Sequence, residues 1–361
     1  MSTTGSTRRD VAVVAYSQTP FVPKAADHNE VELVMPAVHD VLERTGLDSQ
    51  RIGFTVSGSN DYLMGQPFSF VSALDGVGAW PPIEESHVEM DGAWALYEAW
   101  VRLQHGDIDT ALVYAFGKSS SGDLGRVLSL QLEPYTTQPL WPEPDHLAAI
   151  QARLCLEGGV VTHEQMAEVA ARSNTNGFHN DAVATSTAMT AAEVAGQAMA
   201  FDPLRPSDIG PVADGAAAIV LAAGDTARDL SDRPAWISGI AHRIESHAIG
   251  TRDLTTSAST RLAAQAAGVG DPASIELAEL YAPYSHQEVL LAEAIGLRAS
   301  ADINPSGGAL AAHPLMVAGL ARIGEAAERI TNGDADRAVA HATAGPCLQQ
   351  NLVAVLEGTA R

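Results

Sequence analysis

The stretch Asn304-Pro-Ser-Gly-Gly-Ala-Leu-Ala-Ala-His-Pro-Leu-Met-Val-Ala-Gly319 is the most specific segment of the sequence. It opens with turn-forming residues, and a His-Pro pair, His313 and Pro314, precedes an apolar run. The apolar residues that follow predict a long helix over Met316–Ile330. The segment therefore predicts a glycine-rich turn that leads into a helix.

Strand-like and helical segments alternate on both sides of this stretch. Such alternation predicts a sheet with helices on its faces, an α/β architecture. In this second part of the chain the predicted elements are strands over Trp236–Ala241, Ile275–Tyr281 and Leu352–Leu356, and helices over Ser257–Ala267 and Gln287–Ile295.

The first part of the chain has a similar series of elements. Its clearest helix is Glu30–Thr45, which has apolar residues at helical spacing and Gly46 at its end. Two similar halves, 1–232 and 233–361, are therefore predicted, with the boundary near Arg233-Pro234. The other elements predicted in the first part are strands over Val11–Tyr16, Ile52–Val56, Ala111–Ala115 and Ala216–Ala222, and a helix over Gly92–His105.

Residues 117–203 depart from this rhythm. They hold several prolines and two predicted helices, His146–Leu156 and His163–Asn174. Long excursions between the elements of a compact fold are usually functional. We expect this one to run over the edge of the sheet.

Composition restricts the classes of partner. The 361 residues are 46% hydrophobic and 18% charged, and 21 basic against 44 acidic residues give a net charge of −23. This charge argues against nucleic acid or an anionic membrane as the main partner. Two cysteines, Cys155 and Cys347, cannot form a disulfide framework or a cysteine-rich zinc site. The polar segment Met1–Asp10 and the lack of a long apolar run predict a cytoplasmic protein without a signal peptide or membrane span.

The segment Asn304–Gly319 resembles the thiolase signature, in which Gly-Gly precedes His-Pro at the start of a helix. Thr19-Pro20-Phe21, Asp214-Gly215-Ala216 and Glu279-Leu280-Tyr281 follow the family order, so the resemblance covers nearly the whole chain. It is closest to sterol-carrier-protein-type thiolases and the lipid-transfer or steroid side-chain aldolase branch. The resemblance implies two βαβαβαββ halves in five layers (α-β-α-β-α), acyl-CoA substrates and a dimer.

The family's nucleophilic cysteine has no counterpart at its expected place. Thiolases carry it at the N-terminus of the first buried helix, where helix dipole and backbone N–H groups stabilise thiolate and oxyanion. When Gly92 is matched to the family glycine, Glu89 falls at the cysteine position. Glu89 is then either a charge that suits a helix N-terminus or, in an apolar pocket, a general base.

Four further residues match family site positions. His313 corresponds to the histidine that helps to hold the thioester oxygen, or it is satisfied by neighbouring backbone. Tyr281 falls where relatives carry Asn or His, and it is either a hydrogen-bond and proton donor or a buried aromatic residue. Cys347 and His341 lie near the place of the family's second, acid/base cysteine. Either is a candidate proton shuttle, although a free cysteine is more commonly a small buried group.

Two main functions follow from the resemblance. The first is retro-aldol cleavage of a β-hydroxyacyl-CoA, which needs no acyl-enzyme, with Glu89 or Tyr281 as base and Tyr281 or His341 returning the proton. The second is a catalytically silent subunit or acyl-CoA carrier. Acyl transfer through Cys347 is a third, weaker hypothesis. No tightly bound cofactor is expected, since coenzyme A belongs to the substrate, and the expected partners are a second thiolase-like chain and a small zinc-ribbon/OB-fold protein.

Overall fold

The computed structural model describes residues 8–78 and 82–360, so most of the predicted polar N-terminal segment lies outside the described residues. Within these ranges the strands form one mixed sheet. The strands are β1 (Val11–Gln18), β2 (Phe54–Gly58), β3 (Glu85–Val88), β4 (Thr110–Gly117), β5 (Gly215–Ala223), β6 (Ala235–Ile244), β7 (Leu277–Leu280), β8 (Asp302–Ile303), β9 (Arg337–Ala344) and β10 (Gln350–Glu357).

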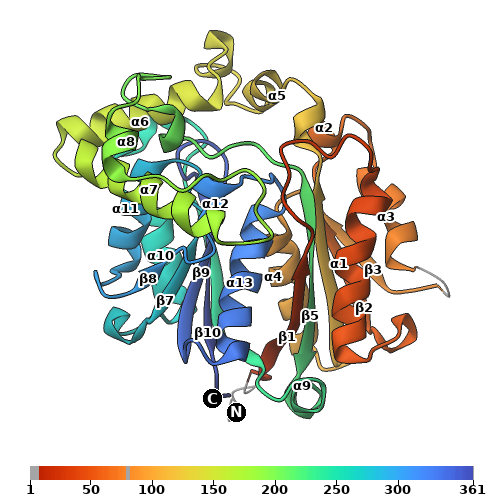
Figure 1. Cartoon of the computed structure of the whole chain (residues 1–361). Helices are drawn as coiled ribbons and strands as arrows, with labels where there is room; N and C mark the ends of the chain where they lie inside the picture. The colour runs from red at the N-terminus through yellow and green to blue at the C-terminus, as the bar shows by residue number, and fades with distance from the viewer. Residues whose placement is uncertain (1–7, 79–81, 361) are drawn as a thin grey trace, which may run out of the picture.

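Helices connect these strands and flank the sheet (Figure 1). In the first half they are α1 (Glu30–Thr45), α2 (Asp61–Met64), α3 (Ser69–Val77), α4 (Gly92–Gln104), α5 (Leu124–Leu130), α6 (Pro144–Glu157), α7 (His163–Phe178), α8 (Ala191–Ala195) and α9 (Gly224–Leu230). In the second half they are α10 (Ala258–Ala267), α11 (Ser285–Ile295), α12 (Gly308–Ala311) and α13 (Ala318–Asn332).

The sheet repeats one topology twice. Its strand order is β3-β2-β4-β5-β1-β6-β10-β9-β7-β8, so each half runs inward from its edge to a central pair, β1 and β6. Strand directions repeat as well: β2 is parallel to β3 and β4, and β7 is parallel to β8 and β9, while the two strands nearest the centre in each half pair antiparallel. The predicted βαβαβαββ halves are confirmed, and the boundary at residues 232 and 233 stays a prediction.

Five layers are visible in Figure 1: an outer helix layer with α1, one half-sheet, the helices α4 and α13, the other half-sheet, and an outer layer with α10 and α11. Three buried apolar clusters fill the spaces between them. Strand β1 illustrates how the sheet packs on both faces. Val11 and Val13 pack toward α4 and α13, while Ala12 and Val14 pack toward α1. Side chains alternate across a strand, so a sheet covered on both faces needs an almost continuous apolar run.

The predicted elements that agree best with the structure are those whose ends are marked by capping residues. Helix α1 has the predicted bounds, begins with a capping box between Asn29 and Glu32, and ends at Gly46 in the left-handed conformation. Strand β9 was not among the predicted elements. Its alternate residues are small alanines, a residue type that is depleted in strands, and burial on both faces holds it in the sheet.

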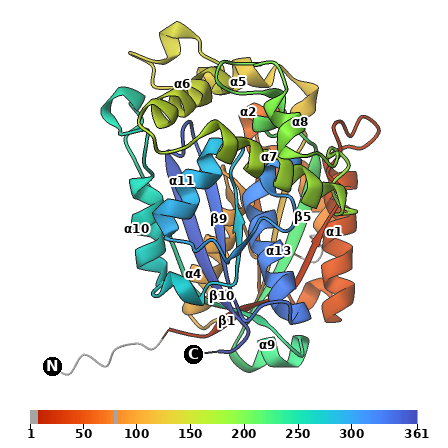
Figure 2. The same ribbon diagram turned by 60° about the vertical axis from the view of Figure 1, so that its left-hand side comes forward.

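The excursion at residues 117–203 contains α5 to α8 and lies over one end of the layered body (Figure 2). That end carries the carboxyl ends of the parallel strands, where ligands bind in open α/β sheets. No helix among the described residues is both long and apolar enough to cross a membrane.

Candidate active site

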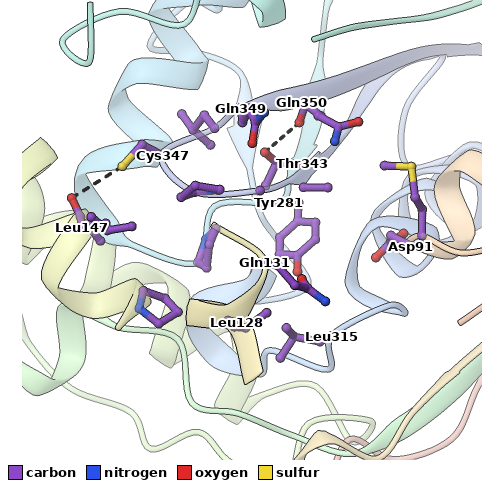
Figure 3. A pocket seen from close by; sticks show the side chains of 18 of the residues that line it. Asp91, Leu128, Gln131, Leu147, Tyr281, Leu315, Thr343, Cys347, Gln349 and Gln350 are labelled. Carbon is purple, nitrogen blue, oxygen red and sulfur yellow. Dashed lines mark hydrogen bonds between the residues drawn. The ribbon is translucent and has the colours of Figure 1, made fainter. Parts of the chain in front are cut away.

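A cavity of about 580 Å³ lies beneath the excursion. Its walls come from the residues before α4, from α5 and α6, from the segments that follow β7 and β9, and from the turn before α13. Figure 3 shows Asp91 and Cys347 on opposite sides of Tyr281. Apolar side chains form most of the walls: Leu63, Met90, Leu128, Leu132, Pro142, Pro144, Leu147, Ala148, Ile244, Leu315, Met316 and Leu348.

Tyr281 and His313 form a hydrogen-bonded pair in the cavity wall. The Tyr281 hydroxyl lies 2.7 Å from His313 Nε2, and the rings meet edge to face with centroids 5.5 Å apart. Tyr281 directly follows β7, and its backbone N–H donates to the carbonyl of His341. His313 is fixed by backbone hydrogen bonds with Pro211 and Ala213. Two distant segments thus place both polar groups at one point of the wall.

The glycine-rich turn before α13 lies in close contact with the backbone of α7. Gly307 has a φ of 99°, and a Cβ at that position would lie 2.6 Å from the Cα of Gly177 on α7. Only glycine tolerates both the positive φ and this contact. The carboxylate of Glu279 on β7 accepts hydrogen bonds from the backbone and hydroxyl of Ser306 and pairs with Arg322 of α13 at 2.7 Å. The turn is therefore tied to the strand that carries Tyr281.

Burial keeps the Tyr281–His313 pair neutral. It lowers the pKa of His313 to about 4, so the imidazole is uncharged at neutral pH. Burial also raises the pKa of Tyr281 well above its usual value, and the negative charge of Asp91 raises it further. A neutral phenol and a neutral imidazole act as hydrogen-bond donors and as acid–base partners, not as fixed charges.

Asp91 connects the N-termini of the two central helices. Its Oδ1 accepts from the backbone N–H of Ala93 at 2.9 Å and of Leu320 at 3.0 Å, and its Oδ2 accepts from Gly319 at 2.9 Å. A Cβ on Gly319 would lie 2.4 Å from Oδ1, so the last residue of the quoted stretch must be glycine for this contact. One carboxylate thus satisfies free N–H groups of both α4 and α13.

Asp91 lines the cavity but is only 1% exposed. Loss of hydration raises its pKa to about 6, although the three backbone donors act in the opposite direction. Asp91 is not among the predicted site residues. Its place directly before a predicted helix is a typical N-cap pattern, so its role at α4 could have been predicted. Its contact with α13 could not, because that helix lies more than 220 residues away in the sequence.

Glu89, Met90 and Asp91 directly precede α4, and all three line the cavity. The Glu89 side chain is 45% exposed. Its Oε1 accepts from the backbone N–H of Asp61 at 2.6 Å, and its Oε2 lies 3.1 Å from His87 Nε2. Glu89 therefore sits at the solvent side of the wall and holds the loop before α2, whereas Asp91 holds the buried helix ends.

Cys347 lines the cavity from the turn between β9 and β10. Its thiol is buried and donates to the carbonyl of Leu147 at 3.5 Å. Burial raises its pKa to about 12, against the opposing influence of the Arg252 guanidinium, so the sulfur is a neutral thiol at neutral pH.

His341 lies outside the cavity lining. It is fully buried on β9, and its Nε2 is 2.9 Å from Oδ1 of Asn351, which donates in turn to Ser259 of α10. Burial lowers the pKa of His341 to about 4. Tyr281, His313, Glu89 and Cys347 are thus brought to one cavity, and His341 belongs to the outer helix–sheet layer.

Three of the six non-glycine residues with a positive φ angle in the described part of the chain line this cavity. Met316, Cys347 and Leu348 all line it and have positive φ angles of 71°, 53° and 58°. Side-chain-bearing residues rarely adopt this conformation, and such strain clusters at active sites and ligand clamps. The backbone therefore marks the same site as the polar groups.

Comparison with known proteins finds relatives that are named for their activity on acetyl-CoA. Acetyl-CoA acetyltransferase of Methanothermobacter thermautotrophicus is 28% identical over 348 residues, which cover 88% of this chain and 90% of the relative. The solved structure described as "Ltp2-ChsH2(DUF35) aldolase" superposes with a TM-score of 0.78 and 19% identity, covering 97% of this chain and 98% of that one.

Acetyl-CoA acetyltransferase of Bacillus anthracis superposes with a TM-score of 0.80 and 15% identity, covering 98% of this chain and all of that one (100%). No protein-family model matches the chain. The chain has the thiolase fold. The chain is thus similar over most of its length to an acetyl-CoA acetyltransferase in sequence, and it shares the architecture of the solved thiolase-fold proteins.

Proposed function

We propose that this chain is a cytoplasmic acyl-CoA carbon–carbon lyase that cleaves β-hydroxyacyl thioesters by a retro-aldol reaction. The observation that carries the proposal is the position of Asp91. Its carboxylate occupies the N–H groups where α4 and α13 meet, so an acyl oxyanion or thiolate has no free donors there. The Tyr281–His313 pair remains as the polar group that faces a substrate oxygen.

The proposed reaction needs one stabilised oxyanion and no covalent intermediate. A base takes the proton of the β-hydroxyl group, the β-carbon becomes a carbonyl, and the electron pair of the Cα–Cβ bond moves into the thioester as an enolate. The enolate carbon then takes up a proton. The products are an aldehyde or ketone and a shortened acyl-CoA, and no oxidant or second substrate is consumed.

The residues divide these tasks by their charge. When neutral His313 carries its proton on Nε2 and donates to the Tyr281 oxygen, the Tyr281 hydroxyl donates to the enolate oxygen, a contact worth about 3–4 kcal/mol per donor in other enzymes. The bases available in the cavity wall are the carboxylates Glu89 and Asp91 and the Tyr281 hydroxyl. Tyr281 is placed to return the proton, whereas His341 would have to act from outside the cavity lining.

Acyl transfer through Cys347 is the second candidate. It is favoured by the place of this thiol in the cavity wall and by the activity named for the curated relatives. The high pKa of Cys347 counts against it, because only a thiolate attacks a thioester at a useful rate.

Coenzyme A is expected only as part of the substrate. The cavity lining of the described chain contains no lysine or arginine, so the phosphates of the coenzyme would bind outside it. We further propose that the chain forms a dimer and that a small zinc-ribbon/OB-fold protein assists it. The edge strand β3 is half-buried, and Phe68 and Val71 beside its half-sheet are 70% and 52% exposed, which suits a protein contact.

Product analysis tests the proposal. The protein is incubated with panels of β-hydroxyacyl-CoA and β-ketoacyl-CoA, with and without the candidate small partner. The expected result is equal amounts of a free carbonyl product and a shortened acyl-CoA from hydroxyacyl substrates. Binding without turnover under every condition would instead assign a silent carrier, and an acyl group on Cys347 would assign acyl transfer. Glu89→Gln and Asp91→Asn then separate the two candidate carboxylate bases.

A further inference from the structure

One wall of the cavity holds a buried hydrogen-bond acceptor that no described residue satisfies. Gln287 on α11 lines the cavity and is 2% exposed. Its Oε1 has no hydrogen-bond partner within residues 8–78 and 82–360. A buried acceptor without a partner costs about 1–3 kcal/mol, so such groups are rare unless a ligand or another molecule completes them.

The hydrogen bonds behind Gln287 determine which of its amide atoms is free. Gln151 of α6 donates through Nε2 to the carbonyl of Leu254 at 3.1 Å, so its Oε1 faces the other way. That oxygen lies 2.9 Å from Gln287 Nε2 and accepts from it. If the Gln287 amide were reversed, two oxygens would face each other. The unsatisfied atom of Gln287 is therefore an acceptor.

The same oxygen of Gln151 fixes the neighbouring histidine. Burial lowers the pKa of His286 to about 3 and leaves a neutral ring, whose Nε2 lies 3.2 Å from this oxygen. Because the amide oxygen of Gln151 can only accept, the ring carries its proton on Nε2 and donates it. Two donors thus converge on Gln151. Its oxygen stays satisfied even when Gln287 is replaced, which makes Gln287 a suitable position for mutagenesis.

The surroundings place this acceptor beside α6. Gln287 contacts α6 through Gln151, and Leu147 and Ala148 of the same helix line the cavity with it. In Figure 3 Leu147 lies beyond Tyr281 on the side opposite Asp91. The cavity therefore has an unsatisfied acceptor in a predominantly apolar wall, next to the helix that carries Leu147 and Ala148.

We propose that Gln287 Oε1 is a specificity subsite that accepts a hydrogen bond from a hydroxyl or amide N–H group of the bound thioester. The proposal rests on the assignment of the cavity to an acyl-CoA. Two parts of such a ligand carry the required donor: a hydroxyl on the acyl chain, or an amide of the pantetheine arm. Where the donor is an acyl hydroxyl, a plain hydrocarbon acyl group leaves the acceptor unsatisfied and binds less tightly, because a site built for a hydrogen bond discriminates against a ligand that lacks the donor.

Equilibrium binding separates these sources without requiring turnover. Calorimetry compares free coenzyme A, octanoyl-CoA and its terminally hydroxylated analogue on the intact protein, on Gln287→Leu and on Gln265→Leu. Gln265 is an exposed glutamine of α10 that does not line the cavity, so Gln265→Leu serves as the control and should leave all three affinities unchanged. Thermal melting checks that each variant is folded.

If an acyl hydroxyl fills the subsite, the hydroxylated thioester binds the wild type about tenfold more tightly than octanoyl-CoA, and Gln287→Leu removes the difference. If a pantetheine amide fills it, Gln287→Leu weakens all three ligands equally. Unchanged affinities for all three in the folded variant would overturn the inference. Lyase activity is measured separately, so a protein with the binding difference but no turnover would refute the proposed function alone.

Discussion

The two central helices occupy equivalent places in the repeated topology, yet their N-termini differ. Helix α4 brings its own N-cap, Asp91, whereas α13 begins after Val317, which provides no side-chain cap. The N–H groups of α13 are satisfied by Asp91 from the other half. The first half of the molecule thus supplies a carboxylate, and the second half supplies backbone N–H groups that donate to it.

The polar groups of the cavity follow the same division. Tyr281, His313 and Cys347 come from the second half and are kept neutral by burial, whereas the carboxylates Glu89 and Asp91 come from the first half. A duplicated scaffold with two different helix ends can therefore place neutral donors opposite carboxylates. Only the side with neutral donors can stabilise a negative oxygen. The arrangement therefore suits a reaction in which a single oxyanion develops.

The largest effect on the rate of cleavage is expected at the neutral Tyr281–His313 pair. Tyr281→Phe removes the hydroxyl next to His313 and should lower kcat/KM for cleavage by about 100- to 1,000-fold, because the enolate loses a donor. Steady-state kinetics of carbonyl release measure it. Tyr284→Phe is the matched control, since the Tyr284 hydroxyl bonds to Asp145 and not to His313. Equal losses in both variants would contradict a special role for Tyr281.

The role of the Asp91 carboxylate is tested by measuring the stability of the protein as a function of pH. The folded pKa of Asp91 is about 6, above the reference value of 3.8, so the folded chain binds this proton more tightly than the unfolded chain. Its contribution to stability is full below about pH 4 and is lost as the pH rises through 6. Relative to Asp91→Asn, the wild type should lose roughly 2 kcal/mol of unfolding free energy between pH 4 and 7. Urea titrations measure this difference, and a difference that is constant with pH would refute the assigned pKa.

The outer layer of the second half should matter for folding more than for cleavage. His341→Gln disturbs the hydrogen bond to Asn351 and is expected to cost about 1–2 kcal/mol of stability. Cleavage at a temperature where the variant is folded should change by less than about threefold, because His341 does not line the cavity. A loss of kcat with unchanged stability would return His341 to the list of proton shuttles.

The smallest effect is expected at the sulfur. Cys347→Ser should leave cleavage within about threefold of the wild type, since a neutral thiol takes no part in the proposed reaction. Alkylation of Cys347 by iodoacetamide at neutral pH should be slow for the same reason. Fast labelling together with loss of activity would instead favour acyl transfer.

Much of the fold could be predicted from the sequence, because short-range signals encode it. The cap residues of α1 and the apolar run of β5 are examples. The candidate site was predictable only in part. Tyr281 and His313 stand in recognisable segments, but their contact spans 32 positions. The orientation of His341 depends on which face of β9 is outward, and β9 itself has no clear strand signal.

Mass spectrometry of a turnover carried out in deuterium oxide is the most direct test of the central claim. The reaction is quenched during steady-state cleavage of a β-hydroxyacyl-CoA, and both the protein and the products are weighed. We expect a shortened acyl-CoA with one deuterium on its α-carbon and a protein that carries no acyl group. A protein that carries the acyl group on Cys347 would contradict a reaction without a covalent intermediate.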